Sequence, residues 1–471
     1  MNSFTDFKKD FYSRVNDFAL FDCGDINLLK VVLDGLKVNY VGRGQVRPYL
    51  FFPLYIYNLF TKIKTIQYRK DRHINSFTSS ISAYANRKYL VSDAGRIING
   101  ADNLPRSIYF DNIVKSLGRE NVVIVADKLA NEKLDHDFDL NRLTDMFIYD
   151  SLLPEEKKLR SELIGTYIKI KKAKIFSKKE LANIQFAIHR FFNLYKVWNR
   201  FLNTFTDIKT CYFVCHYHKE GQIYALKKHG IKCTELQHGL IAPQDIFYVF
   251  PEKILLIKNR TLFADKILVY GKHWKEVLLK GAEYSSNQID IIGYYHYNNF
   301  KNYNKEVNEL NIMLGSREVI LITTQTFLHE HFINYTKQLA NDIEKSSRNI
   351  IILLKPHPSE DENIYKKAFL NSNVVKIIQY PLPLLFEKAK AHISIFSTTL
   401  YDAIRYNVKN YVFKVNGYED YVNEILSSGI AKEVMIGQNP LDLLLTQNSN
   451  SQLVSSEYYY ERLNEEILTQ N

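Results

Sequence analysis

The sequence predicts an α/β protein with two doubly wound domains, each a parallel sheet covered by helices. Three observations support this prediction. Short, continuously apolar runs of strand length recur along the chain and alternate with longer helical stretches. These runs fall into two series, separated by a polar segment at 294–317 that is rich in Asn, Tyr and Lys. With 471 residues, the chain also exceeds the size of one ordinary hydrophobic core.

The N-terminal half is expected to contain a helical region at 1–85, followed by the first doubly wound domain at 86–293. The longest helical stretch in this half runs from Lys178 to Phe205. Strands that alternate with helices are joined by right-handed crossovers and therefore run parallel. The predicted strands are Lys88–Gly95, Asn121–Asp127, Cys211–His218, Lys232–Gly239 and Lys266–Gly271.

The C-terminal half repeats this pattern after the linker at 294–317, which is expected to act as a hinge. A second doubly wound domain is predicted at 318–448, and a C-terminal helix or tail at 449–471. Ligands of such sheets bind outside the carboxyl ends of the strands, so the loops that follow the strands are the expected site. The predicted strands are Glu318–Thr326, Asn349–Pro358, Asn373–Tyr380, Ala391–Thr399 and Lys409–Val415.

The composition limits the class of protein. Hydrophobic residues make up 46% and charged residues 24%, which is typical of a soluble globular protein. The net charge of +11 favours anionic partners, among them nucleotides and lipid head groups. The basic residues form no aromatic-interleaved patch of a recognised type, so no nucleic-acid partner is expected. The N-terminus has no apolar signal core and no run is long enough to span a membrane, so a cytoplasmic location is expected.

No metal or dinucleotide site is predicted. The four cysteines have no zinc spacing and are expected to be free thiols in a reducing compartment. The run "DHDFD", Asp135–Asp139, resembles an Asp-x-Asp metal motif but lies in a polar stretch and is expected to be solvated. Neither a P-loop nor a G-x-G-x-x-G fingerprint occurs. The cysteines are Cys23, Cys211, Cys215 and Cys233.

Two basic segments bear on a membrane partner. Aromatic residues between Tyr49 and Phe60 precede five cations in the stretch up to Arg72, a combination that suits a lipid head-group layer. A helix packed on the core with a solvated basic end is the alternative interpretation, and it is preferred. The second segment, Lys169–Lys179, is expected to be a solvated helix face.

The loops after the second-domain strands collect residues suited to binding a nucleotide phosphate ester. Ser397–Thr399 open a predicted helix, where hydroxyl and N–H groups can bind phosphate oxygens. Prolines on both sides of His357 restrict its backbone and so fix its direction. Asp402, one turn into the helix, can accept hydrogen bonds from ribose hydroxyls. The candidate donor-binding residues are Thr324, Gln325, Lys355, His357, Pro358, Ser397, Thr398, Thr399 and Asp402.

These motifs resemble a known family. "LLKPHP" and "ISIFSTTLYDAIRYNVKNYVF" are similar to the C-terminal half of GT-B glycosyltransferases of bacterial surface polysaccharide synthesis. The similar groups are capsule Kdo transferases, bacterial sialyl- and polysialyltransferases, and CDP-glycerol glycerophosphotransferases. The resemblance implies the GT-B fold, in which two Rossmann-like domains face each other across a cleft. It also implies that the His-Pro and Ser/Thr motifs hold the phosphate of a cytidine-linked donor.

The first domain carries a further part of the resemblance. "LQHGL" and "IDIIGYYHYN" resemble the His-Gly motif and the strand end before the interdomain linker. The latter lacks the Pro-Arg-x-Asp pattern of the glycerophosphotransferases, which favours a sugar donor. The family's Gly after the Ser/Thr helix is here Asn407, which can adopt the same left-handed conformation.

The resemblance implies a metal-independent transfer of a sugar from a CMP-linked donor, such as one carrying sialic acid or Kdo. The expected acceptor is an oligosaccharide or a lipid-linked glycan. His238 is the expected catalytic base, because a neutral imidazole titrates near working pH. Lys355 and His357 are expected to stabilise the leaving nucleotide. Glu235, Asp93 and Asp245 are the alternative bases.

Three other functions stay open. They are a CDP-glycerol-type polyol-phosphate transferase, a UDP-sugar epimerase, and a capsule assembly protein that retains the fold without turnover. Peripheral association with the inner face of the plasma membrane through an anionic surface is also left open.

Overall fold

The computed structural model describes most of the chain, in two compact units that are treated separately. The described residues are 4–40, 84, 86–99, 104–126, 135–257, 259–296, 303–326, 328–346, 348–416, 419–434, 441 and 456–469. The first unit comprises Met1–Asn298 together with Tyr460–Asn471, and the second comprises Asn299–Tyr459. The aromatic and basic segment at 49–72 lies outside the described residues.

The first unit is built on a seven-stranded sheet, which is parallel throughout. Its spatial order is β11-β10-β9-β8-β3-β6-β7. When the strands are ranked by their order in the chain, this is the doubly wound order 3-2-1-4-5-6 with a seventh strand added. The strands are β3 (Tyr89–Asp93), β6 (Val122–Ala126), β7 (Phe138–Asp139), β8 (Thr210–Val214), β9 (Lys232–Leu236), β10 (Lys266–Val269) and β11 (Ile289–Ile291).

Helices of the first unit pack against this sheet and against each other. The longest, α8, begins with a capping box in which Ser177 and Glu180 satisfy each other's backbone N–H groups. A Cβ added to Gly35 of α2 would lie 2.9 Å from the carbonyl of Asn183 in α8, so glycine permits this close approach. The helices are α1 (Phe4–Arg14), α2 (Leu29–Tyr40), α5 (Asp111–Leu117), α6 (Leu140–Phe147), α7 (Pro154–Lys172), α8 (Lys178–Leu202), α9 (Glu220–Lys228), α10 (Lys272–Leu278) and α19 (Glu466–Thr469).

Two small hairpins and the C-terminal segment complete the first unit. The hairpins are β1–β2 (Asp22–Cys23, Ile26–Asn27) and β4–β5 (Ile97–Asn99, Pro105–Ser107). After the second unit the chain returns to the first. The N–H of Tyr294 bonds the carbonyl of Glu461 at 2.9 Å, and the N–H of Asn464 bonds the carbonyl of Ile292 at 2.8 Å. The C-terminal tail predicted from the sequence therefore extends the edge of the first unit beside β11.

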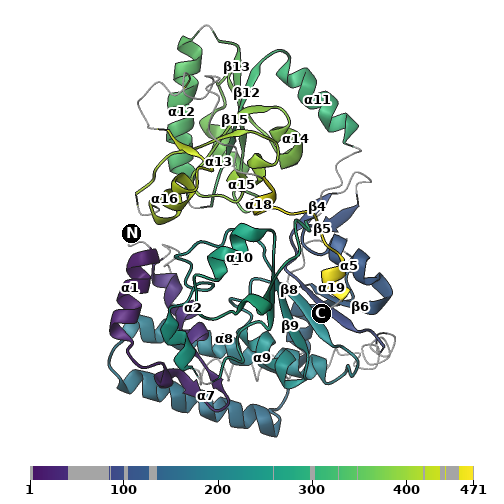
Figure 1. The fold of residues 1–471 in the computed structure, drawn as a ribbon, viewed down its shortest axis with the longest axis vertical. Helices are drawn as coiled ribbons and strands as arrows, with labels where there is room; N and C mark the ends of the chain where they lie inside the picture. Colours follow the sequence, from purple (N-terminus) through teal and green to yellow (C-terminus); the bar gives the residue numbers. More distant parts are fainter. Residues whose placement is uncertain are drawn as a thin grey trace. The chain divides into compact units, whose positions relative to one another are not determined.

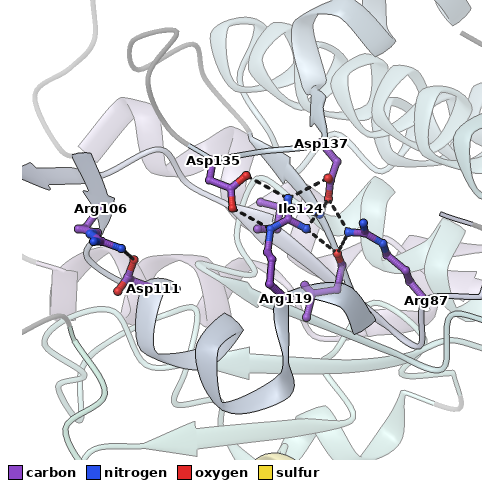
Figure 2. A network of polar contacts seen from close by, with 8 residues as sticks. Arg87, Arg106, Asp111, Arg119, Ile124, Asp135 and Asp137 are labelled. Carbon is purple, nitrogen blue, oxygen red and sulfur yellow. Dashed lines mark hydrogen bonds and ion pairs between the residues drawn. The ribbon is translucent and has the colours of Figure 1, made fainter. Parts of the chain in front are cut away.

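The Asp-x-Asp run forms a structural arginine network (Figure 2). Arg119 bonds Asp135 at 2.8 Å and Asp137 at 2.8 Å, and Arg87 also contacts Asp137. Asp137 further accepts the N–H of Ile124 at 2.8 Å, which fastens it to β6. The expectation that the run is solvated is wrong for Asp137, whose side chain is 4% exposed, and for Asp139, which is also 4% exposed. It is right for Asp135, whose side chain is 74% exposed. Among the described residues no group of His, Cys, Asp and Glu could hold a metal ion.

The second unit has a six-stranded parallel sheet in the order β14-β13-β12-β15-β16-β17. Ranked along the chain, this is again 3-2-1-4-5-6. The strands are β12 (Glu318–Thr323), β13 (Ile350–Lys355), β14 (Val375–Ile377), β15 (Ala389–Ser394), β16 (Lys409–Val412) and β17 (Lys432–Glu433). The helices are α11 (Asn304–Leu314), α12 (His329–Lys345), α13 (Glu362–Ala368), α14 (Leu382–Phe386), α15 (Thr399–Ile404), α16 (Glu419–Ser427) and α18 (Ser456–Tyr459).

Helices cover both faces of the second sheet (Figure 1). On one face α11 and α14 pack in a buried cluster with alternate residues of the central strands, among them Leu321 and Leu353. On the other face Tyr335 of α12 stacks on Phe413 with ring centroids 4.5 Å apart. The strands are buried on both sides, which explains their continuously apolar sequences.

Two local predictions, on Asn407 and on the cysteines, are confirmed. Asn407, after α15, has a positive φ of 57°, as the missing glycine requires. All four cysteines are free. No helix among the described residues is long and apolar enough to cross a membrane.

Candidate functional site

The strand order places one topological switch point in each unit. At this point the connections that follow two neighbouring strands run in opposite directions along the sheet. In the first unit it lies between β3 and β8, and in the second between β12 and β15. Loops separate at such a point and leave room for a ligand beyond the carboxyl ends of the strands. The predicted site residues follow these strands or their immediate neighbours, β9 and β13.

A directed hydrogen-bond chain lies at the second switch point. Asn410 donates its amide N–H to the carbonyl of Leu400 at 2.6 Å, so its Oδ1 faces Nδ1 of His392, 2.8 Å away. An amide oxygen can only accept, so the neutral His392 carries its proton on Nδ1. Burial lowers the pKa of His392 to about 4, which keeps the ring neutral. Nε2 of His392 must then accept from Thr323 Oγ1, at 2.9 Å.

The direction of these hydrogen bonds determines whether the Thr399 hydroxyl can donate to a ligand. Thr323 gives its hydroxyl proton to His392, so the 2.8 Å contact between Thr323 and Thr399 needs Thr399 as the donor. The hydroxyl proton of Thr399 is therefore used inside the protein and is not available to a phosphate. Ser397 differs, because its Oγ accepts the N–H of Thr399 at 3.2 Å and keeps its own proton for another acceptor.

The loop of His357 is held by Glu360, a residue that is not among the predicted site residues. Glu360 accepts the backbone N–H of His357 at 3.1 Å and the hydroxyl of Tyr365 at 2.9 Å, and also contacts Thr324. The helix cap is instead Asp361, which accepts the N–H of Asn363. The sequence offered a signal for this buttress, since an acid three residues after a histidine in a turn can reach back to its N–H.

The orientation of the His357 ring is also fixed. Its Nδ1 accepts the backbone N–H of Ser359 at 3.1 Å, so the neutral ring carries its proton on Nε2. Lys355 lies at the end of β13, and burial lowers the pKa of its ammonium group to about 8. Both groups suit the oxygens of a phosphate. Pro358 is exposed, and Asp402 is half-buried on α15.

Three consecutive residues join the two loops of the second unit. Thr323 contacts Thr399, Thr324 accepts the N–H of His357 at 2.9 Å, and Gln325 accepts the N–H of Phe396 at 2.9 Å. The end of β12 therefore positions the His-Pro loop and the Ser/Thr loop together. The sequence predicted both loops and the residues Thr324 and Gln325, but not this connecting role.

The first switch point contains a buried ionised carboxylate. Glu235, in β9, is fully buried and accepts hydrogen bonds from Nδ1 of His216 at 2.6 Å and from the hydroxyl of Tyr248 at 2.6 Å. The backbone N–H of His216 adds a third bond at 3.1 Å. Burial alone would raise the pKa of Glu235, but His216 and these bonds hold it below its usual range. Glu235 thus fixes the loop after β8, and its catalytic role stays a prediction.

His238 follows the same strand and lies partly exposed. Its Nε2 is 3.0 Å from the hydroxyl of Tyr217, while its Nδ1 has no hydrogen-bond partner among the described residues. Burial lowers the pKa of His238 to about 4 despite the nearby charge of Glu235, so the imidazole is neutral at pH 7. Cys215 lies 3.6 Å from the same tyrosine hydroxyl. The imidazole is therefore positioned and neutral, but its lowered pKa is contrary to the expectation that it titrates near working pH, and its role as the base stays a prediction.

The two remaining predicted carboxylates shape turns. Asp93 ends β3, is 3% exposed, and accepts the N–H of Gly95 at 2.9 Å. Asp245 accepts the N–H of Phe247 at 2.9 Å, and burial raises its pKa. Their catalytic roles stay predictions. His216 helps to hold the loop after β8 through its bond to Glu235.

Comparison with known proteins adds a likeness of fold. No protein-family model and no curated protein matches the chain. Among solved structures, a candidate UDP-N-acetylglucosamine 2-epimerase from Listeria monocytogenes is 13% identical, with a TM-score of 0.50 over 81% of this chain and 95% of that chain. At this identity the likeness supports the predicted class of two Rossmann-like α/β domains, which the strand orders confirm.

Two other solved structures are similar over a comparable length. The UDP-GlcNAc 2-epimerase from Neisseria meningitidis, bound to UDP-GlcNAc, is 13% identical, with a TM-score of 0.49 over 81% of this chain and 98% of that chain. HepE from Anabaena, in complex with UDP-glucose, is 11% identical, with a TM-score of 0.43 over 81% of this chain and 97% of that chain.

Proposed function

We propose that the chain is a metal-independent glycosyltransferase that moves a sugar from a nucleotide-activated donor to a surface glycan acceptor. One observation carries the proposal: residues 323–325 join the His357 loop and the Ser397–Thr399 loop at the switch point of the second sheet. Two loops that present N–H, O–H and ammonium donors to one place suit a nucleotide phosphate.

The donor phosphate is assigned to Nε2–H of His357, the ammonium of Lys355 and the hydroxyls of Ser397 and Thr398. The directed chain removes Thr399 from this set and gives it a positioning role. Asp402 is assigned to the ribose hydroxyls. These assignments refine the sequence prediction. They need no metal ion, because an imidazole N–H, an ammonium group and hydroxyls together can stabilise the leaving phosphate.

The proposed reaction is a single displacement in outline. The acceptor oxygen forms a bond to the anomeric carbon while the bond from that carbon to the donor phosphate breaks. The acceptor proton passes to His238, and the bonding electrons leave with the nucleotide. Tyr217 orients the imidazole through its 3.0 Å contact with Nε2. Glu235 holds the loop after β8 in place through its bond to His216.

The nucleotide is proposed to be CMP, on the resemblance of the two motifs. A solved structure of similar fold is a candidate UDP-N-acetylglucosamine 2-epimerase, so uridine nucleotides are the first competitors to test. A thermal-shift panel of CMP, CDP, UMP, UDP and GDP is the direct experiment, because a ligand of the native state raises its melting temperature. Stabilisation by none of these nucleotides contradicts the proposal.

A UDP-sugar 2-epimerase is the second candidate, favoured by the likeness of fold to such enzymes. The two functions differ in their need for an acceptor. An epimerase converts UDP-GlcNAc to its C2 epimer with no second substrate, whereas a transferase releases nucleotide only when an acceptor hydroxyl is present. Proton NMR of UDP-GlcNAc incubated with the protein alone separates them: appearance of the epimer decides for the epimerase.

A further inference from the structure

The C-terminal half of α7 and the turn into α8 form a basic surface on the first unit. Between Leu163 and Lys179 the sequence has six lysines and no acidic residue. All six side chains are exposed, and none forms an ion pair with any described residue. The nearest acid that follows, Glu180, is occupied by Arg14 at 3.0 Å. The lysines are Lys169, Lys171, Lys172, Lys174, Lys178 and Lys179.

Two isoleucines stand on the exposed side of the same helix. Ile164 is 50% and Ile168 45% exposed, and they lie one turn apart. The opposite side of α7 buries Leu163, Thr166 and Ile170, so the helix is already anchored without the exposed pair. Figure 1 shows α7 at the outer edge of the first unit.

A shallow pocket lies beside this surface. Its volume is about 380 Å³, and it is lined by residues 14–17, 19 and 20 from the end of α1 together with Ala173 and Ile175 of the turn. Arg14 contributes to its wall, and the Nε of this arginine has no hydrogen-bond partner among the described residues. Asp17 also lines this pocket, and Arg14 is paired with Asp10 and Glu180, so the six lysines alone make this surface basic.

We propose that this surface, residues 164–179, docks the first unit on an anionic phospholipid bilayer. Lysines beside exposed aliphatic side chains are the pattern of interfacial binding, in which charge attracts and apolar groups insert at the head-group boundary. Isoleucine offers nothing to a nucleic-acid backbone or base stack, so lipid is the better match. The proposal is independent of the proposed catalytic function.

Flotation with vesicles tests this surface on the full chain. Phosphatidylcholine vesicles with about one third phosphatidylglycerol are compared with phosphatidylcholine alone, at low and at high salt. The wild type is expected to float with the anionic vesicles at low salt only. The triple variant Lys171→Glu, Lys172→Glu, Lys174→Glu is expected to bind at least about a hundredfold more weakly, since each lysine lost near such a surface costs roughly fivefold and each glutamate gained adds repulsion.

A matched control makes the same change of net charge on the second unit instead of the first. Lys337→Glu, Lys345→Glu, Lys367→Glu alters three exposed lysines of the second unit by the same amount and is expected to float like the wild type. Ile164→Ser, Ile168→Ser tests the apolar part and is expected to lower partitioning several-fold. The unfolding temperature of each variant establishes that it folds.

Several outcomes overturn the proposal. Equal flotation of the wild type and the first triple variant would assign binding to other residues, including those at 41–83. Flotation with neither vesicle, or equally with both, removes the electrostatic docking. Binding to duplex DNA in an electrophoretic assay without flotation would decide for a nucleic-acid surface instead. Nucleotide-induced thermal shifts report separately on the proposed function, so failure of one claim is distinguishable from failure of the other.

Discussion

The two switch points share a strand order but not a chemistry. In the first unit, ionisable side chains collect: Glu235 bonded to His216, and His238 bonded to Tyr217. In the second unit, the core of the site is a chain of uncharged groups that runs from Thr399 through Thr323 to His392. Its cationic and anionic members, Lys355 and Glu360, lie on the neighbouring His-Pro loop.

Under the proposed function, this difference corresponds to a base in the first unit and a phosphate site in the second. A base must change its protonation during a reaction, so it belongs in a cluster whose charges can balance it. A phosphate site must present donors in fixed directions, which a hydrogen-bond chain of known polarity provides without net charge. Variants in the first unit should therefore alter turnover, and variants in the second should alter nucleotide affinity.

Removal of His238 is the largest expected effect. His238→Ala deletes the proposed base and should lower kcat by about 10²–10⁴-fold, the usual contribution of general base catalysis. The dissociation constant of the nucleotide, measured by calorimetry, should stay within about twofold of the wild type, because the proposed donor-binding groups lie in the other unit. His229→Gln, at a histidine that contacts Asn199 instead, is the control. Unchanged kcat in His238→Ala would break the comparison.

His357→Ala should have the converse effect. Loss of one hydrogen bond to a charged phosphate should weaken nucleotide binding by about 10–100-fold. Calorimetric titration with the nucleotide that gives the greatest thermal shift measures this change. His331→Ala, at an exposed histidine of α12, should bind like the wild type. A His357→Ala protein that binds nucleotide normally would remove the phosphate from this loop.

The pH dependence should separate the two units further. Burial lowers the pKa of His238 to about 4, so kcat/KM should persist well below pH 6.5, where an ordinary histidine would become protonated. Burial lowers the pKa of Lys355 to about 8, so nucleotide affinity should fall above pH 8, by at most about tenfold per pH unit. Lys355→Met should bind weakly and lose this alkaline dependence. An acid limb near pH 6.5 would contradict the burial of His238.

The sequence predicted the fold well because its signals are local. Every strand of the two series appears in the structure near its predicted place, since a strand buried on both faces needs a short apolar run. The strand order could not be read in the same way. It depends on which crossovers pack together, and only the sheet pairing shows that β3 lies beside β8 and β12 beside β15.

The sequence predicted which residues lie at the site, but not the hydrogen bonds that join them. Residues after strands were identified by chemistry, and the structure brings Thr324, His357 and the Ser/Thr loop together. His392 was missed because it lies inside an apolar strand, where a histidine carries no local sign of its partner. Asn410 is 18 residues further along the chain, and only the adjacent strand β16 places it against His392.

The smallest expected effect distinguishes two hydroxyls that the sequence treated alike. Ser397→Ala removes a hydroxyl whose proton is available to a phosphate, so nucleotide affinity should fall by about five- to tenfold with little change in stability. Thr399→Val removes a hydroxyl whose proton bonds Thr323, so the free energy of unfolding should fall by about 1 kcal/mol while affinity changes less than in Ser397→Ala. Calorimetry and urea unfolding of both variants give the two numbers. A larger loss of affinity in Thr399→Val would mean that these hydrogen bonds run in the opposite direction. The proton of His392 would then lie on Nε2 rather than on Nδ1.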